Sequence, residues 1–381
     1  MKSSGVELYR YAGMERATLL RRYKRFLGDV KPAEQLEAGQ AVAAVETVHV
    51  PNTGPMTGLL DNLPAPAVLS RSTAASRKYP CTLEWLRPAP AAPWVGVHSA
   101  RANALARVLL EKHLLSGLGT YDRVRSEVAY GAGSRVDFVL ERSAEEGSSA
   151  GSSAGGPEGG SEEGAEGSKN TAVSTAATLP LYLEVKSVTL AETLSGAALR
   201  DQYVAVEDGE FEIQAKASGA SAPRLLPGSS STTVGLFPDT VSLRARKHVE
   251  ALTRLAAGRG ARAALLFLAQ RGDCQAVAPC FAADPRYASL VSAAARGGVL
   301  LLGAAVGLDE REGVVRFVRQ VPVLLPRAAA GWAPPVRGKT RRGEEATKPF
   351  ALALDDGEVE GRRKKTRSAA DLETFRFRRK T

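Results

Sequence analysis

The sequence predicts two folded domains, a small and mostly β domain followed by a mixed α/β domain with a central sheet. The chain has 381 residues, of which 44% are hydrophobic, and this is enough to bury two separate cores. Residues 17–97 contain short apolar runs separated by turn-forming residues, which is typical of a small β domain. Residues 99–325 alternate between helical and strand periodicity in the order α, β, β, β, α, β, α, β, which indicates a mixed sheet.

The first domain is expected to span residues 16–97, after an N-terminal extension of residues 1–15. Its clearest signal is the apolar run Val48-His49-Val50, followed by the turn-forming segment Pro51-Asn52-Thr53-Gly54-Pro55. The second domain is expected to span residues 98–326.

The second domain begins with a helix and three strands. Ser99 is expected to cap the helix, whose apolar residues recur at helical spacing through Leu115. The strands are predicted at about residues 127–130, 135–140 and 181–188, where β-branched and aromatic residues are frequent.

The rest of this domain repeats the alternation of helix and strand. Asp239 is expected to cap a helix that continues through Leu255, and Asp284, followed by Pro285, to cap a later helix. Further strands are predicted at residues 263–269, 299–306 and 314–325.

Three segments have a composition that does not predict a packed core. Residues 143–178 consist mostly of Gly, Ser, Ala and Glu, and we expect a disordered acidic insertion. Residues 196–234 are predicted to be a second, partly ordered insertion, and residues 327–381 a basic, disordered tail. The run Arg362-Arg363-Lys364-Lys365 in this tail is compatible with nuclear import or nucleic-acid contact, although a solvated charge run is the commoner case.

Charge and cysteine content restrict the class of protein. The net charge of +10 is concentrated at the ends, with +6 in residues 1–110, −3 in 111–326 and +7 in 327–381, which suits either a polyanionic partner or a solubilising tail. The three cysteines indicate reduced thiols, and no apolar run approaches the roughly 20 residues of a membrane span. We therefore expect a soluble intracellular protein, whether of the cytoplasm, the nucleus or an organelle.

One group of charged residues has the arrangement of a catalytic site. Because side chains alternate along a strand, Glu184 and Lys186 project from one face of strand 181–188, and Asp137 projects from strand 135–140. Two carboxylates on a rigid sheet suit Mg²⁺, or Mn²⁺ in its place, and the adjacent lysine could orient a water molecule or stabilise charge on a phosphate. Glu127 could support the same centre.

A purely structural explanation also fits these residues. Glu184 and Lys186 could form a same-face ion pair, and Asp137 could pair with Arg135, as exposed strand residues often do.

The N-terminal domain carries the chemistry of nucleic-acid binding. In Arg21-Arg22-Tyr23-Lys24-Arg25-Phe26 basic side chains alternate with aromatic ones, and Arg77-Lys78-Tyr79 repeats this pattern weakly. The alternative is that the aromatic residues pack in the core, and for Phe26 we expect this. The turn at Asn52 could hold a phosphate, although an ordinary tight turn is commoner.

Other catalytic classes find no support. The four histidines lack metal-ligand spacing, and we expect Cys274 and Cys280 to be buried. There is no phosphate-binding Gly-Lys-Ser loop and no dinucleotide fingerprint, which excludes the common NTPase and dehydrogenase classes.

Several longer segments, in the same order, resemble the sugar fermentation stimulation protein A family. They are Arg22-Tyr23-Lys24-Arg25-Phe26-Leu27-Gly28-Asp29-Val30, Pro51-Asn52-Thr53-Gly54-Pro55-Met56-Thr57-Gly58, Arg77-Lys78-Tyr79-Pro80, Ser126-Glu127-Val128, Ser134-Arg135-Val136-Asp137-Phe138, Glu184-Val185-Lys186-Ser187-Val188-Thr189-Leu190 and Phe237-Pro238-Asp239. The resemblance implies an N-terminal OB-fold barrel, a C-terminal restriction-endonuclease-like PD-(D/E)xK domain with a central mixed sheet, and DNA binding; in bacteria it implies a regulatory role in sugar fermentation. The site residues it implies are acidic Glu127, Asp137, Glu184 and Asp239, and basic Lys186, Lys247 and His248.

The sequence thus predicts a DNA-binding protein whose second domain carries a magnesium-dependent nuclease site. A DNA-binding module without catalysis is the alternative, and a nuclease acting on RNA is a third hypothesis. The oligomeric state stays open.

Overall fold

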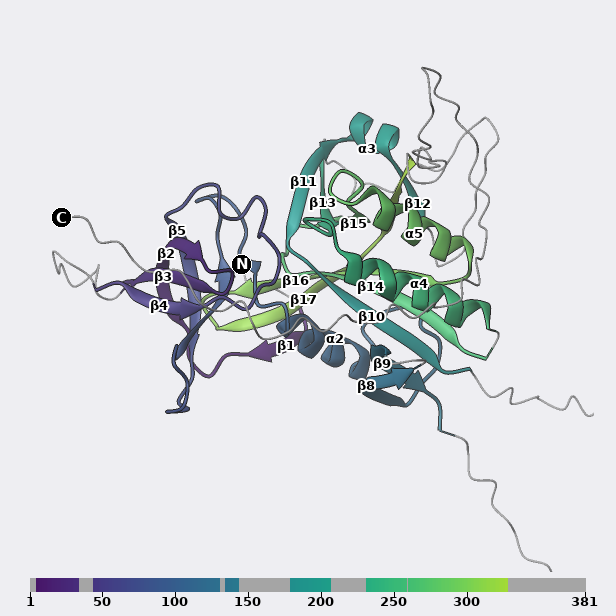
Figure 1. Cartoon of the computed structure of the whole chain (residues 1–381), viewed down its shortest axis with the longest axis horizontal. Coiled ribbons are helices and arrows are strands. Elements are labelled where there is room, and N and C mark those ends of the chain that lie inside the picture. The colour runs from purple at the N-terminus through teal and green to yellow at the C-terminus, as the bar shows by residue number, and fades with distance from the viewer. Residues whose placement is uncertain are drawn as a thin grey trace, which may run out of the picture. The chain divides into compact units, whose positions relative to one another are not determined.

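The computed structural model describes residues 5–33, 44–130, 134–143, 179–206, 231–258 and 260–327. They form a small barrel at the N-terminal end and, after it, two mixed sheets with a few helices (Figure 1). The predicted fold class, a small β-barrel followed by a mixed α/β domain, is confirmed.

The barrel closes because its strands pair in a ring. The antiparallel order β4-β3-β2-β5-β6 is completed by a pairing of β4 with β6 at His49↔Thr82, and β7 extends from β6. Alternate aliphatic side chains point inward, and Leu19, Val48 and Leu83 are fully buried. The strands are β2 (Glu15–Tyr23), β3 (Leu27–Pro32), β4 (Glu46–His49), β5 (Ala65–Arg71), β6 (Cys81–Leu86) and β7 (Val95–Gly96).

The second domain contains a seven-stranded sheet of order β1-β17-β16-β14-β10-β9-β8. Its centre, β10-β14-β16, is parallel, and the outer pairs are antiparallel. The edge strand β1 comes from the predicted N-terminal extension. The strands are β1 (Glu7–Arg10), β8 (Arg123–Tyr130), β9 (Ser134–Glu141), β10 (Leu181–Val188), β14 (Arg262–Ala269), β16 (Leu300–Asp309) and β17 (Val314–Val321).

Helices cover both faces of this sheet. Helix α2 (Arg101–Glu111) packs on one face, and helices α4 (Leu243–Ala257) and α5 (Pro285–Arg296) pack on the other (Figure 1). The residues of β14 alternate between the two cores, with Leu266 facing α2 and Leu265 facing α4 and α5. A strand buried on both faces explains why residues 263–269 have no polar positions.

Two predicted helix caps are wrong, and one is confirmed. Asp284 accepts a hydrogen bond from the Tyr287 N–H and caps α5, as expected. Helix α2 starts after Ala100 and ends at Glu111, while the Ser99 hydroxyl donates to the Pro51 carbonyl of the barrel. Helix α4 is capped by Ser242, because the Asp239 carboxylate instead accepts the Met56 N–H of the barrel. Both mispredicted residues thus bond to the barrel rather than to a helix N-terminus.

A five-stranded sheet of order β11-β13-β15-β18-β12 lies outside the sequence predictions. Its strands are β11 (Leu190–Ser195), β12 (Tyr203–Val206), β13 (Ser231–Phe237), β15 (Ala276–Pro279) and β18 (Val323–Pro326). The range predicted for the second insertion therefore includes helix α3 (Gly196–Gln202), β12 and the start of β13. Residues 314–325 form strands in two different sheets. Residues 144–178, 207–230 and 328–381 of the predicted insertions and tail lie outside the described residues.

None of the helices described, of which α4 is the longest with 15 residues, combines the length and the hydropathy that a membrane span requires.

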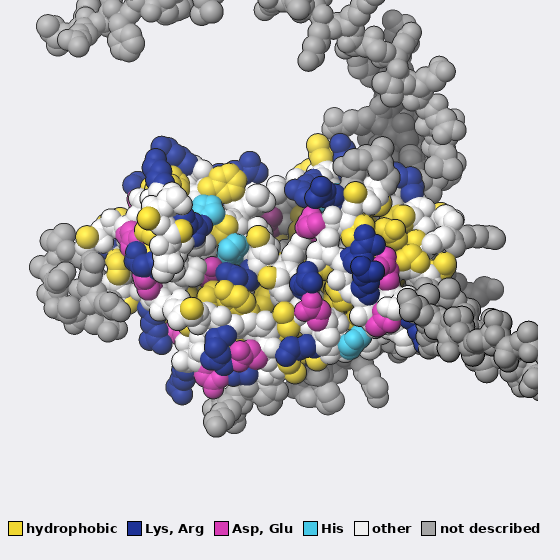
Figure 2. Space-filling model, turned by 90° about the horizontal axis from the view of Figure 1, so that it is seen from below, with side chains coloured by type: hydrophobic (Ala, Val, Ile, Leu, Met, Phe, Trp, Pro, Cys, Tyr) yellow, Lys and Arg dark blue, Asp and Glu magenta, His cyan; other side chains and the backbone are white. Residues whose placement is uncertain are grey.

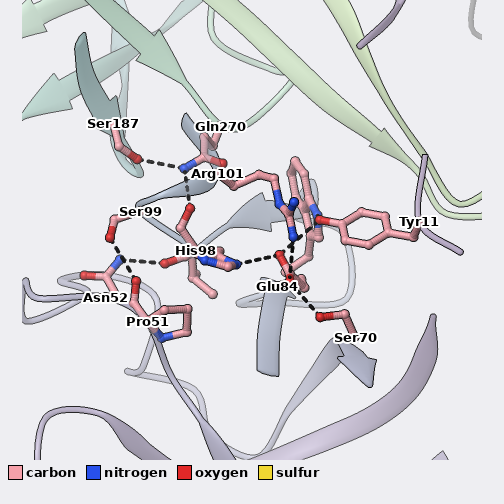
Figure 3. A network of polar contacts seen from close by, with 12 residues as sticks. Tyr11, Pro51, Asn52, Ser70, Glu84, His98, Ser99, Arg101, Ser187 and Gln270 are labelled. Atoms are coloured by element: carbon pink, nitrogen blue, oxygen red, sulfur yellow. Dashed lines mark hydrogen bonds and ion pairs between the residues drawn. The ribbon is translucent and has the colours of Figure 1, made fainter. Parts of the chain in front are cut away.

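A buried carboxylate, Glu84 of β6, connects the barrel to the second domain (Figure 3). Its side chain is 1% exposed and bonds to His98 Nδ1 at 3.0 Å, to the Arg101 guanidinium of α2 at 3.1 Å and to the Ser70 hydroxyl at 2.7 Å. The Tyr11 hydroxyl, at the end of β1, adds a bond of 3.2 Å. The partners come from three parts of the chain, so one charge holds them together.

The electrostatics of Glu84 follow from these contacts. Burial alone would raise its pKa, but the hydrogen bond from His98 and the charges of His98 and Arg101 outweigh that effect and lower the pKa to about 2. The carboxylate is therefore ionised at neutral pH, and its charge is compensated within the junction.

The first prediction concerns the loss of this charge. Glu84→Gln leaves Arg101 largely buried without a counterion, so the free energy of unfolding should fall by about 3 kcal/mol. Glu7→Gln removes the carboxylate of an exposed ion pair with Arg10, which solvent screens, and should leave the free energy of unfolding nearly unchanged. Urea unfolding of both variants measures the difference, and equal effects would contradict the role assigned to Glu84.

The second prediction is a pH dependence. A carboxylate whose pKa is lower in the folded state, here about 2 against an ordinary 4.5, stabilises the fold fully above pH 4.5, and this contribution is lost as the pH falls toward 2. The stability difference between wild type and Glu84→Gln should therefore shrink steadily below about pH 4.5. Urea unfolding at a series of pH values measures this, and a difference that does not change with pH would show that Glu84 is not the group responsible.

Candidate active site

A cavity of about 390 Å³ is lined by residues of both domains. Its polar wall from the barrel contains Arg25, Asn52 and Gly54, and its remaining walls come from α2, β9, β10, β13, α4 and the segment that leads into α4. Three of the predicted catalytic residues, Asp137, Glu184 and Lys186, line it together.

Strand β10 positions Glu184 and Lys186. Leu181, Leu183 and Val185 point into the core beneath α2, so the alternate residues face the side covered by α4. The Glu184 and Lys186 residues are only 4% and 7% exposed, and the Lys186 Nζ atom donates to Glu184 Oε1 at 2.8 Å. Glu184 and Lys186 thus form a buried ion pair, whereas the purely structural explanation of the sequence predicted an ion pair at the surface.

Helix α4 adds His248 to this pair. Its Nδ1 atom contacts Glu184 Oε1 and lies 3.3 Å from Lys186 Nζ. Val249 and Leu252 anchor the helix in the core, which holds the His248 ring over the strand. Burial would raise the pKa of Glu184, but the hydrogen bonds from His248 and Lys186 outweigh it, and the pKa is lowered.

Asp137 lies where the pairing of β9 with β10 ends. The last paired residues are Leu183↔Phe138, and the Val185 N–H beyond them donates to Asp137 Oδ2 at 2.7 Å. Asn103 of α2 donates to Asp137 Oδ1 at 2.8 Å. The purely structural explanation predicted an ion pair between Asp137 and Arg135. Among the described residues, Asp137 instead bonds to Asn103 and to the Val185 N–H.

The charge of Asp137 is unfavourable in this position. Burial and the nearby Glu184 carboxylate raise its pKa, and the Val185 N–H, Lys186 and Asn103 reverse only part of this. A cavity that holds two carboxylates and raises the pKa of one of them would gain stability from a bound cation.

Asn103 is a residue of the site that the sequence did not predict. It lies next to the buried Ala102 on an amphipathic helix, and an isolated amide at such a position carries no signal of a catalytic neighbour.

Three other predicted residues are placed differently. Glu127 is exposed at an irregularity of β8, with a φ of 54°, and does not line the cavity. Lys247 is also exposed and outside the cavity lining. Asp239 lines the cavity and bonds to the barrel at Met56. Gly54 packs so closely on Asp239 that a Cβ atom there would lie 2.9 Å from its carboxylate oxygen.

The predicted turn at Asn52 is held by contacts within the barrel. Arg22 donates to the carbonyls of Gly54, Asn52 and Arg25 at 2.9, 2.7 and 2.6 Å. Asn52 is only 8% exposed. Its side-chain amide donates to the Val97 carbonyl and accepts a hydrogen bond from the Gly54 N–H. Arg22 and Asn52 therefore shape the cavity wall, while Arg25 bonds to Thr53 O and lines the cavity itself.

The other predicted nucleic-acid residues are largely at the barrel surface. The Arg21 side chain is 71% exposed and paired with Asp29, to which Tyr23 also donates. Lys24 is exposed in the β2–β3 hairpin, where its φ of 46° belongs to a tight turn.

Phe26, expected in the core, is 40% exposed, because the hairpin turn carries it outward. Arg77 and Lys78 are exposed on the loop between β5 and β6. The Lys78 ammonium lies 5.5 Å from the Tyr79 ring centre.

The cysteine prediction is confirmed. Cys274 and Cys280 are buried, as is Cys81, and all three are free thiols. Within the described ranges, no group of three or more His, Cys, Asp and Glu side chains is arranged to hold a metal ion. A divalent cation would have to be bound by the two carboxylates Asp137 and Glu184 with water.

Comparison with known proteins identifies the domains. Residues 20–97 match a family model described as the SfsA N-terminal OB domain, and residues 228–312 match the sugar fermentation stimulation protein RE domain. A sugar fermentation stimulation protein homolog of Gloeobacter violaceus is 32% identical over 319 residues, which cover 84% of this chain and 98% of that protein. The homolog of Citrifermentans bemidjiense is 34% identical over 309 residues, 81% of this chain and 96% of its own.

A solved structure has the same fold. It is described as the structure of Pyrococcus furiosus SfsA in complex with Ca²⁺, and it has a TM-score of 0.56 at 17% identity, with coverage of 84% of this chain and 99% of that one. The homologs match this chain over almost their whole length, and the two family models match parts of the barrel and of the second domain. The chain therefore belongs to the sugar fermentation stimulation protein family.

Proposed function

We propose that this protein binds DNA and hydrolyses its phosphodiester bonds with the help of Mg²⁺. The observation that carries the proposal is the convergence of Asp137, Glu184 and Lys186 in one cavity that also reaches the basic face of the barrel. Two carboxylates and a lysine are the groups that hold a divalent cation and a water molecule against a phosphate.

The two carboxylates suit a hard cation. Bonds among the described residues use Oε1 of Glu184 and leave Oε2 without a hydrogen bond. The raised pKa of Asp137, caused by burial and by Glu184, marks an excess of negative charge that a cation would relieve. The Pyrococcus furiosus relative was described with Ca²⁺, which prefers the same oxygen ligands.

When bound, Mg²⁺ would lower the pKa of a coordinated water molecule and offset charge on the phosphate. The residues of the chain do the rest. Lys186 lies beside Glu184 and can orient the attacking water or donate to a phosphate oxygen. Asn103 fixes the orientation of Asp137, and His248 fixes that of Glu184.

The surface around the cavity supplies positive charge. Lys and Arg side chains, drawn in dark blue, lie on both sides of a hollow in the face that Figure 2 shows. Exposed Arg21, Lys24 and Arg25 on the β2–β3 hairpin and Arg77 and Lys78 on a neighbouring loop belong to the barrel. Such charges attract the phosphate backbone without regard to sequence.

A second candidate function is DNA binding without catalysis. Glu184 already has two partners, Lys186 and His248, which compensate its charge without a metal ion. RNA as the substrate is a further alternative, which a cleavage assay with both nucleic acids separates.

The third prediction concerns metal binding. Mg²⁺ or Mn²⁺ at about ten times its dissociation constant should stabilise the wild type by about 1.4 kcal/mol and raise its melting temperature by about 2–4 °C. Asp137→Ala and Glu184→Ala should abolish this increase, because they remove the proposed ligands. Glu192→Gln, which changes an exposed carboxylate of β11, is the matched control and should respond like the wild type. Variants that still respond would place the metal ion elsewhere.

The fourth prediction concerns catalysis. Purified protein should cleave labelled DNA in the presence of Mg²⁺ or Mn²⁺ and not with a chelator. Lys186→Met should lower the rate about 100-fold or more, because it removes the group that acts on water and phosphate. Lys112→Met, at an exposed lysine directly after α2, should leave the rate unchanged.

The outcomes of this assay separate the hypotheses. Metal-dependent stabilisation without cleavage would favour the binding-only alternative, and cleavage of RNA alone would replace DNA as the substrate.

A further inference from the structure

The cavity is bordered by an arginine from each domain. Arg25 lies on the β2–β3 hairpin of the barrel and Arg244 on the first turn of α4, and both line the cavity. Both residues are exposed, and neither forms a salt bridge within the described part of the chain. Their contacts are with Thr53 O at 3.1 Å for Arg25 and with His248 Nε2 at 3.5 Å for Arg244. Both guanidinium groups are thus available to an anion.

Exposed apolar side chains accompany both arginines. Phe26, 40% exposed, follows Arg25, whose guanidinium lies 5.8 Å from the centre of its ring. Val241, 56% exposed, precedes α4 and lines the cavity, and Leu243 beside it is 65% exposed. Val241 lines the cavity, whereas Phe26 and Leu243 lie next to lining residues, outside the lining itself. Large exposed apolar residues are few among the described residues, so their position beside a polar cavity points to a ligand with apolar surfaces.

Nucleic acid offers phosphates and apolar base faces together only when its strands are separated. In a duplex the base faces are covered by stacking and pairing, and a protein meets phosphates and groove edges. In a single strand every base has a free face that stacks on aromatic or apolar side chains. We propose that the cavity takes an unpaired DNA strand, with phosphates contacted by Arg25 and Arg244 and bases packed against Phe26 and Val241.

The depth of the cavity favours the same substrate. Glu184 and Lys186 are nearly buried, and the cavity of about 390 Å³ is in the size range of small-ligand sites. A recessed site of this size has room for part of one strand more readily than for a whole duplex. This inference rests on the proposed function, and it specifies the strand state of the substrate and the part of the barrel that selects it.

The test is equilibrium binding, which needs no cleavage. Fluorescence anisotropy with chelator present compares a labelled, unstructured DNA strand of about 12 nucleotides with the blunt duplex of the same sequence. The wild type should bind the single strand about fivefold or more tightly than the duplex, as one stacked base is worth about a fivefold change or more.

The variants separate base packing from phosphate contact. Phe26→Ala and Val241→Ser should reduce the preference for the single strand by about fivefold, with Val45→Ala, another exposed apolar residue, as the matched control. Arg25→Ala and Arg244→Ala should each lower the slope of log affinity against log salt for the single strand by about 0.7. Arg311→Ala, in the exposed turn between β16 and β17, should leave that slope unchanged.

Duplex binding that equals or exceeds single-strand binding would overturn the inference while leaving DNA binding intact. Equal effects of the cavity variants and their matched controls would also overturn it. Failure of the wild type to bind either DNA would instead refute the proposed function.

Discussion

A buried negative charge at Glu84 holds the two domains of this protein together. The carboxylate lies in the barrel, and its partners outside the barrel lie directly after β1, on the segment before α2 and on α2 itself (Figure 3). A charge in the interior is tolerated only when it is paired and hydrogen-bonded, so the junction constrains all of these segments at once. Neighbouring backbone bonds, such as Gly96 N–H to the Gln270 carbonyl at 2.7 Å, fix the same interface.

Helix α2 transmits this constraint to the candidate site. Arg101 bonds to Glu84, and Asn103, two residues later, bonds to Asp137. The helix is held in the core by Leu105 and Leu109, so its two polar contacts are fixed relative to each other. The barrel therefore forms a wall of the cavity and also determines the position of the helix that orients one of its carboxylates.

Much of the fold and the centre of the site could be predicted from local sequence. Alternation along strand 181–188 determined that Glu184 and Lys186 share a face, because the side-chain period of a strand is two. The Asp284-Pro285 pair predicted the start of α5, since the capping bond involves residues only three apart. The matching order of long segments indicated the family, which the comparison with homologs confirms.

Only the tertiary structure decided the contacts between distant segments. Ser99 and Asp239 have the residue types of helix caps, but the barrel offered them other partners, and no local pattern records that competition. The division of residues 314–325 between two sheets depends on strands far away in the chain. The same is true of Asn103 and His248, whose contacts with the carboxylates arise because helices from distant parts of the chain pack on opposite faces of one sheet. Sequence alone determined which residues share a face of each element, because that depends on backbone geometry, whereas packing between elements decided which faces meet.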